Sequence, residues 1–457
     1  MGSIEPPRRR YERTPFGREM LKHFSIDPTY TELNNGSFGS VPTVIMNKAH
    51  ELRKRCEGRP CSFSRYEFPA WLDKSREAVA ELLNATPESV VLVANGSTAS
   101  NTVMRNFVWN EDGKDEIIQI SVIFAPLSKM TGYVGELSQG KVRTRQVQLN
   151  YPLEDDEVVA LFRAGIQASR DAGYRPRLGI FDTVSSTPAI RLPFERLVAL
   201  CREEGVMSFV DGAHAAGHMK IDLAALDPDF FVTCCHKWLF VPRGCAALYV
   251  PARNQWMIRS TLPLSHGFIP TQDIEQGKVD GKLAQALASG KTPFVHNFEF
   301  VAPMDNFGYL CIPESIRWRQ EVCGGEKAIQ TYCVNLAREA GRLMADMLGT
   351  KVLDNKSQSV SACCMTNVLL PLTLDAENPP PGHYVVRSKP GVQFRVSDWI
   401  MRKMATEYET LMPVFFFQGS WWTRGSAQVY LELDDFEWAG RMLQDLCERV
   451  GDGEYLL

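Results

Sequence analysis

The sequence predicts an α/β protein with a large domain, whose mostly parallel sheet lies between helices, and a smaller α+β C-terminal domain. Between about residues 88 and 250, short apolar runs alternate with segments of helical spacing. Strands that are apolar on both faces and separated by helices are typical of parallel sheets covered on both sides. The chain has 457 residues, 44% of them apolar, which is enough to bury a core in both domains.

The predicted elements follow one another along the chain. Helical spacing over 44–55 and 70–83 predicts two helices before the first strand. The predicted strands are the apolar runs 90–94, 117–123, 178–181, 207–210, 230–234 and 246–250. Residues 261–305 are expected to be rich in loops, and helical spacing returns from Pro313 through 329–348. We therefore predict an N-terminal arm over 1–40, a large domain over 41–305 and a small domain over 306–457.

Composition and charge exclude several classes of protein. The net charge is −4, with 50 basic and 54 acidic residues, so no nucleic-acid partner is expected. No apolar stretch approaches the ~20 residues of a spanning helix, so no membrane contact is expected, and no secretory signal is visible. The basic cluster Arg8, Arg9 and Arg10 is expected to be a solvated, mobile end. The twelve cysteines lack the spacing of disulfide frameworks or zinc sites, so we expect reduced thiols, no metal and a cytoplasmic location.

A lysine and an aspartate follow two neighbouring predicted strands. Lys237 comes soon after the run 230–234, and Asp211 closes the run 207–210. Because the carboxyl ends of parallel strands meet at one edge of a sheet, we expect the two side chains to lie close together. A buried lysine amine loses solvation, so its pKa falls and a neutral nucleophile becomes available. Taken singly, the lysine could also reach to water and the aspartate could cap a helix.

Two further polar groups follow predicted strands. Ser97 and Thr98 come after the first strand, where a helix should begin. The free amides of that helix and the two hydroxyls form either an anion site or an ordinary helix cap. Asp182 and Ser185 follow the strand at 178–181.

Together the four groups fit one cofactor, pyridoxal 5′-phosphate. This cofactor needs a lysine for a Schiff base, a carboxylate opposite its pyridine nitrogen, an anion cradle and a partner for its ring hydroxyl. Asp211 would keep the ring nitrogen protonated through a charge-assisted hydrogen bond. The positive ring then stabilises negative charge at the substrate Cα.

Motifs spread over nearly the whole chain resemble those of a known family. They run from LNNGSFG at 33–39 to YLE at 430–432, and the most specific are CHKWL at 235–239 and PRGCA at 242–246. The sequence resembles fold-type-I pyridoxal-phosphate enzymes of the class V aminotransferase family, in the isopenicillin N epimerase-like branch. It is similar to the fungal ergothioneine-pathway C–S lyases and to the loline-type alkaloid cyclase. The resemblance implies a sheet of the seven-stranded type, an amino-acid substrate and a homodimer with shared active sites.

The resemblance also assigns roles to matching residues. It implies that Lys237 forms the Schiff base and moves protons at Cα, and that His214 lies near the cofactor ring or its hydroxyl. The implied cofactor-binding residues are Ser97, Thr98, Asp182, Ser185, Asp211, His214, His236 and Lys237. The implied substrate-binding residues are Asn34, Asn35, Arg65 and Arg424. Arg424 matches the arginine that grips the substrate carboxylate, a role that suits a bidentate guanidinium.

Three positions depart from the family pattern. Phe124 replaces a tyrosine; it can stack on the cofactor but has no hydroxyl for proton transfer. Asn35 replaces a histidine, and Pro303 replaces a threonine that reaches the neighbouring subunit's phosphate. Losing a general acid typically costs about 10²- to 10⁴-fold in rate. We therefore expect an enzyme of specialised, alkaloid-type metabolism that has Phe124 in its catalytic site. We do not expect it to retain C–S cleavage that depends on an acid at this position.

The expected chemistry is decarboxylation or elimination at Cα that leads to ring formation. Three alternatives stay open at this point. The first is a C–S lyase that acts on a cysteine-sulfoxide conjugate such as hercynylcysteine sulfoxide. The second is a class V aminotransferase or epimerase, and the third is a binding protein that has lost activity.

Overall fold

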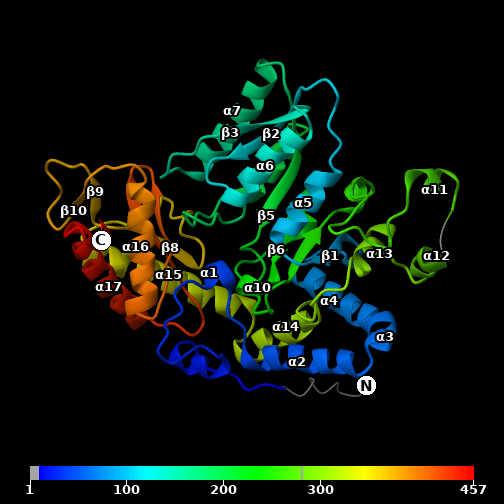
Figure 1. Cartoon of the computed structure of the whole chain (residues 1–457), viewed down its shortest axis with the longest axis horizontal. Helices are drawn as coiled ribbons and strands as arrows, with labels where there is room; N and C mark the ends of the chain where they lie inside the picture. The colour runs from blue at the N-terminus through cyan, green and yellow to red at the C-terminus, as the bar shows by residue number, and fades with distance from the viewer. Residues whose placement is uncertain (1–9, 279–280, 457) are drawn as a thin grey trace, which may run out of the picture.

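The computed structural model describes residues 10–278 and 281–456 and confirms the predicted α/β fold (Figure 1). A seven-stranded sheet forms the centre of the large unit, in the order β1-β7-β6-β5-β4-β2-β3. Its strands are β1 (Val90–Val93), β2 (Asp115–Ile120), β3 (Val142–Val147), β4 (Arg175–Asp182), β5 (Met207–Gly212), β6 (Phe230–Cys234) and β7 (Ala246–Tyr249). β7 is antiparallel to both neighbours, and the other pairs are parallel. The carboxyl ends of all these strands except β7 therefore meet at one edge.

Helices pack against both faces of this sheet. α5 and α6 contact each other and strands β6, β7 and β3, while α7 and α8 contact each other and strands β2 to β5. The helices of the first 300 residues are α1 (Asn35–Phe38), α2 (Thr43–Gly58), α3 (Pro60–Ser62), α4 (Phe68–Leu82), α5 (Gly96–Asn106), α6 (Ala125–Leu137), α7 (Asp155–Asp171), α8 (Phe194–Glu203), α9 (Leu223–Leu226), α10 (Cys235–Trp238), α11 (Thr271–Glu275), α12 (Gly281–Ala288) and α13 (Pro293–Glu299). Across the described ranges, no helix is long and apolar enough to cross a membrane.

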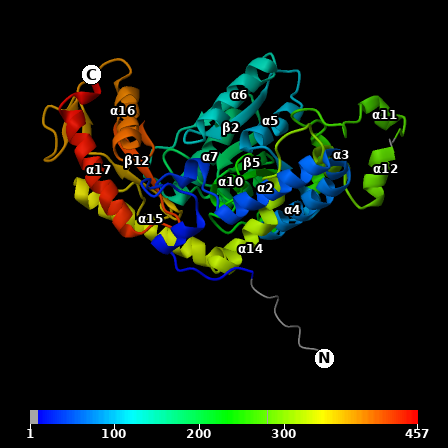
Figure 2. The ribbon, with the colours of Figure 1, turned by 60° about the horizontal axis from the view of Figure 1, so that its bottom comes forward.

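One strand of the large unit was not predicted. The edge strand β3 was not predicted, because its residues VRTRQV carry two arginines instead of an apolar run. Both arginines have a partner in the fold, since Arg143 and Arg145 form ion pairs with the buried Glu116 on β2. The region 261–305 was expected to be rich in loops, and it contains three short helices, α11, α12 and α13, between its loops. α11 and α12 project from the body of the large unit (Figures 1 and 2).

The C-terminal unit has its own antiparallel sheet, in the order β11-β12-β8. Its elements are α14 (Ile312–Val322), α15 (Glu326–Leu348), β8 (Met365–Leu369), β9 (Leu372–Leu374), β10 (Tyr384–Val386), α16 (Val392–Glu407), β11 (Val414–Phe417), β12 (Ser420–Ser426) and α17 (Leu433–Gly451). α15 packs on β8 and α17, whereas α14 packs on α4 of the large unit. α14 and α15 thus run from one unit to the other (Figure 2). The domain boundary at residue 306 stays a prediction.

The described part of the N-terminal arm is bound to the protein surface, which corrects the expectation of a free end. Arg10 forms an ion pair with Glu314 of α14 at 3.2 Å, and its backbone N–H donates to Glu321 at 2.7 Å. These acidic side chains on α14 give the basic arm a place to bind. Arg8 and Arg9 lie outside the described residues.

The buried Arg319 on α14 forms an ion pair with Glu326 of α15 and also contacts the segment that follows β6. The Arg319 side chain is fully buried and donates to both oxygens of Glu326, each at 2.6 Å. It also donates to the backbone carbonyls of Trp238 at 2.7 Å and Gly217 at 2.8 Å. Arg319 therefore holds two loops of the large unit against α14.

Replacing Arg319 by methionine is expected to destabilise the protein by about 3–5 kcal/mol, because Glu326 and two buried carbonyls lose their partner. The measurement is the urea midpoint of unfolding, followed by circular dichroism. Arg317→Met on the same helix is the matched control, since Arg317 is exposed. Equal midpoints for the two variants would contradict the assignment.

Candidate active site

The carboxyl ends of adjacent strands bring four predicted residues together. Asp182 ends β4 and lies opposite Asp211 in the register of β4 and β5. Lys237 lies in α10 directly after β6, which is the other neighbour of β5. Phe124 precedes α6, and its backbone N–H donates to Asp182 Oδ2 at 3.2 Å. The expected grouping of these side chains at one edge of the sheet is therefore present.

The Lys237 amine faces a buried histidine. His214 lies in the turn after β5, and its Nε2 is 3.3 Å from Lys237 Nζ. Its Nδ1 is 3.1 Å from the indole Nε1 of Trp238. Burial lowers the pKa of Lys237 below 10.5, and burial with the nearby Lys237 charge holds the pKa of His214 well below 6.5. Both shifts favour the neutral forms, and the neutral lysine amine is the nucleophilic one.

Two buried carboxyl groups lie beside this amine. Asp211 Oδ1 accepts the backbone N–H of Ala213 at 2.8 Å. Asp182 Oδ1 is buried and has no hydrogen-bond partner among the described residues. Burial raises the pKa of both acids, and the charge of Asp211 raises that of Asp182 further. A bound group that brings a positive charge would reduce the cost of burying two carboxylates, and a hydrogen-bond donor on it would give Asp182 Oδ1 a partner.

α5 begins at Gly96, where the sequence predicted either an anion site or an ordinary helix cap. Asn95 is the N-cap, and its side chain accepts the N–H of Thr98 at 2.8 Å. The hydroxyls of Ser97 and Thr98 are therefore not used for capping. His236 Nδ1 lies 3.0 Å from the carbonyl oxygen of Cys245, so the proton of the neutral ring is on Nδ1. Its Nε2 can donate to an anion only when the ring is cationic, a form that a bound phosphate stabilises.

Arg424 on β12 comes from the other unit and is 1% exposed. It donates to the Ser186 carbonyl at 2.7 Å, to Asn34 Oδ1 at 2.7 Å and to Ser37 Oγ at 2.9 Å. Its Nε is buried and has no partner among the described residues. Burial lowers the pKa of Arg424 to about 10. A buried guanidinium whose partners here are all neutral oxygens is suited to receive an anion.

Three residues that were predicted to bind substrate or cofactor have different contacts in the structure. Asn35 donates its side-chain amide to the backbone carbonyl of Lys237 at 3.2 Å and so holds the arm against α10. The Ser185 hydroxyl donates to a carbonyl within the turn 185–190 at 2.7 Å. Arg65 is exposed, and within the described ranges it has no hydrogen bond or ion pair with the other predicted residues. Their assigned roles stay predictions.

Ser37 and Ser186 were not predicted as site residues, and Trp238 was noted only as a neighbour of the lysine. Ser37 is part of the LNNGSFG motif, and Ser186 belongs to the polar cluster that begins at Asp182. Those two signals could have marked them as candidates. Their contact with Arg424 joins three distant parts of the chain, which no local pattern shows.

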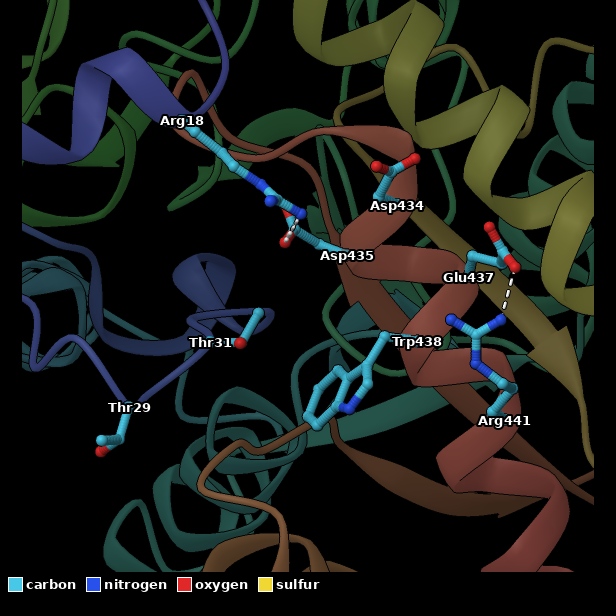
Figure 3. Close-up of a pocket in the computed structure, with 8 residues that line it drawn as sticks. All are labelled: Arg18, Thr29, Thr31, Asp434, Asp435, Glu437, Trp438 and Arg441. Carbon is cyan, nitrogen blue, oxygen red and sulfur yellow. Dashed lines mark hydrogen bonds and ion pairs between the residues drawn. The ribbon is translucent and has the colours of Figure 1, made fainter.

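A surface pocket of about 550 Å³ lies between the N-terminal arm and α17 (Figure 3). Two of its acidic residues have basic partners, since Arg18 pairs with Asp435 at 3.9 Å and Arg441 pairs with Glu437. None of the residues that line it is one of the predicted site residues. This pocket is therefore separate from the site at the sheet edge.

Comparison with known proteins agrees with this geometry. Residues 173–280 match the family model described as "Aminotransferase class-V". The chain is 37% identical to "L-cysteine desulfhydrase-like protein lolT1" of Epichloe uncinata, over 96% of this chain and 97% of that protein. It is 30% identical to "Hercynylcysteine sulfoxide lyase" of Schizosaccharomyces pombe, over 95% and 99%. A solved mutant of C-DES, with glycine covalently linked to its PLP cofactor, has the same fold with a TM-score of 0.72, 17% identity and coverage of 93% and 99%.

The fold and the site together define the class of this protein, which is a fold-type-I enzyme that depends on pyridoxal 5′-phosphate. The chain belongs to the aminotransferase class-V family. The residues present fit the cofactor, because the unpartnered Asp182 oxygen and the α5 amides lie at the same sheet edge as the amine. When bound, the cofactor draws electrons away from the substrate Cα. Lys237, Asp211, Asp182 and the first turn of α5 would hold it.

Proposed function

We propose that the protein is a lyase that breaks the C–S bond of a cysteine-derived amino acid while the substrate keeps its carboxylate. A cysteine S-conjugate and water then give a thiol, pyruvate and ammonium, and a sulfoxide conjugate gives a sulfenic acid in place of the thiol. The full-length similarity to a protein named as desulfhydrase-like and to one named as a sulfoxide lyase supports this reaction class.

The buried Arg424 is the observation that carries the proposal. Arg424 donates to Asn34 at 2.7 Å, and the next residue, Asn35, donates to the Lys237 carbonyl at 3.2 Å, so the arm connects the guanidinium to the segment that carries the amine. A guanidinium stabilises a carboxylate in its charged form and therefore opposes its departure as neutral CO₂. An amino acid bound at Arg424 is thus held for cleavage of the Cα–H bond next to Lys237.

Lys237 can then move the protons that elimination requires. In its neutral form Nζ accepts the proton from Cα. Phe124 has no hydroxyl, so the proton for the departing sulfur comes from Lys237 or is not needed at all. A sulfenate is a weak base and departs with little acid assistance, which favours sulfoxide substrates over simple thioethers.

Decarboxylative ring formation is the second candidate. It is favoured by Phe124, because chemistry that begins with loss of the carboxylate needs no acid at this position. It is disfavoured by Arg424, whose buried guanidinium would bind the leaving carboxylate too well.

The deciding experiment offers the cofactor-loaded enzyme L-cysteine, S-methyl-L-cysteine sulfoxide and hercynylcysteine sulfoxide. We expect pyruvate and ammonium in equal amounts, fastest from a sulfoxide, and no CO₂. Stoichiometric CO₂ without pyruvate would replace the proposal by the second candidate. Release of neither product from any of the three compounds would contradict C–S lyase activity.

We also propose that the enzyme is a homodimer with shared active sites, as the resemblance implies. Large apolar side chains are exposed on the arm, on the helical turn that carries Arg65 and in the turn after β7: Phe38 at 67%, Tyr66 at 78% and Trp256 at 73%. Exposed aromatic side chains of this kind are typical of interfaces. Sedimentation equilibrium is expected to give twice the chain mass, and a monomer at micromolar concentration would contradict the proposal.

A further inference from the structure

Trp238 is the nearest buried aromatic partner of the histidine that faces the reactive amine. Its indole Nε1 lies 3.1 Å from His214 Nδ1, and His214 Nε2 lies 3.3 Å from Lys237 Nζ. Trp238 and His214 are 2% and 3% exposed. The three side chains thus form one hydrogen-bonded chain from the protein interior to the amine.

The chemistry of indole decides where the histidine proton lies. An indole N–H can only donate a hydrogen bond, so His214 Nδ1 must accept and cannot carry a proton. A neutral imidazole then carries its single proton on Nε2. That N–H points to Lys237, where it can donate only to the lone pair of an uncharged nitrogen.

Trp238 is packed on its ring and on its backbone. Its ring packs against His218 with centroids 4.3 Å apart. The backbone carbonyl of Trp238 accepts from Arg319 at 2.7 Å. Gly217 allows the close approach of the turn that carries His214, because a Cβ there would lie 2.6 Å from the Trp238 carbonyl oxygen. The ring contact thus restricts the indole, and the two backbone contacts restrict the segment that carries it.

We propose that Trp238 is a positioning residue that keeps His214 in its Nε2–H tautomer, so that His214 donates to the Lys237 nitrogen and keeps it uncharged. If the tautomer changed, Nε2 would accept from a lysine ammonium and would favour the charged, unreactive amine. The proposal depends on the role of Lys237 in the proposed function but not on the identity of the substrate.

Other ionisable groups also lie near the amine and influence its pKa. Asp211, Asp182 and Cys234 favour its charged form, whereas Arg424 disfavours it. His214 is in turn surrounded by the cationic or ionisable groups Lys237, Arg424, His218 and His236, each of which disfavours a second proton on its ring. Trp238 is uncharged, so its replacement alters the tautomer without altering this set of charges.

The test uses the full-length, cofactor-loaded protein with ¹⁵N-labelled histidine. In the wild type, NMR is expected to show His214 protonated at Nε2 and unprotonated at Nδ1, with assignment from the loss of that signal in His214→Gln. In Trp238→Phe, the Nδ1–H tautomer should appear. After removal of pyridoxal 5′-phosphate, the pH midpoint for its recapture should then be about one unit higher than in the wild type. At a given pH below that midpoint, recapture should be about tenfold slower.

Trp318→Phe is the matched control, since Trp318 is also fully buried but packs against Phe24 and Phe240 instead of His214. It should change neither the tautomer nor the midpoint. A wild-type His214 protonated at Nδ1 would overturn the proposal, even if Trp238→Phe failed to fold. An unchanged tautomer and midpoint in a folded Trp238→Phe would overturn it too. Because these readouts need no substrate, failure of the proposed lyase reaction leaves them unaffected.

Discussion

Replacing Lys237 by alanine is expected to lower kcat by at least about 10³-fold, because we propose that this residue both binds the cofactor covalently and moves the Cα proton. The amine is buried next to His214 Nε2 at 3.3 Å, and burial lowers its pKa below 10.5, which favours the neutral, nucleophilic form. The measurement is steady-state turnover of the fastest substrate found in the assay above. Borohydride treatment followed by peptide mass spectrometry should find the reduced cofactor on Lys237 in the wild type and at no position in the variant.

Lys220→Ala is the control for this prediction, since Lys220 is exposed and lies only a few residues beyond His214 in the sequence. It should keep wild-type turnover and labelling. A Lys237→Ala enzyme that still incorporates the cofactor at another lysine and retains more than about a tenth of the activity would contradict the assignment.

Replacing Arg424 by methionine has the second largest expected effect, a loss of about 10²- to 10⁴-fold in affinity for an amino acid, because two charge-assisted hydrogen bonds disappear. The buried Nε is free to donate, and the other nitrogens donate to neutral oxygens that a carboxylate can replace. Spectral titration with L-alanine, which has no group to eliminate, measures binding separately from turnover. Ethylamine has no carboxylate and should bind both enzymes equally weakly.

Arg424→Lys separates charge from geometry, because lysine keeps the charge but loses the planar fork. We expect an affinity between that of the methionine variant and that of the wild type. Arg395→Met, an exposed arginine on α16, is the control and should leave the titration unchanged. If Arg424→Met weakened L-alanine and ethylamine equally, the arginine would not be the carboxylate ligand.

Several features of the site could be predicted because they are local in the chain. Asp211, Asp182 and Lys237 each come at or just after the end of an apolar strand, and parallel strands bring such ends to one edge. The same reasoning failed for β3, whose arginines pair with a buried acid on β2 and hide its strand pattern. It also gave no means of seeing that Asn95, and not a serine or threonine, caps α5.

The sequence by itself determined the α/β fold class and the cofactor, and it predicted Lys237 as the reactive lysine, since strand ends and motifs are properties of short segments. Only the tertiary structure decided which residues surround Arg424 and which nitrogen of His214 faces the amine. Arg424 donates hydrogen bonds to Asn34 and Ser186, which are distant from it in the chain. Trp238 donates a hydrogen bond to His214 from a different turn. The physical reason is that a hydrogen bond depends on distance and direction within a packed interior, and residue spacing along the chain contains neither.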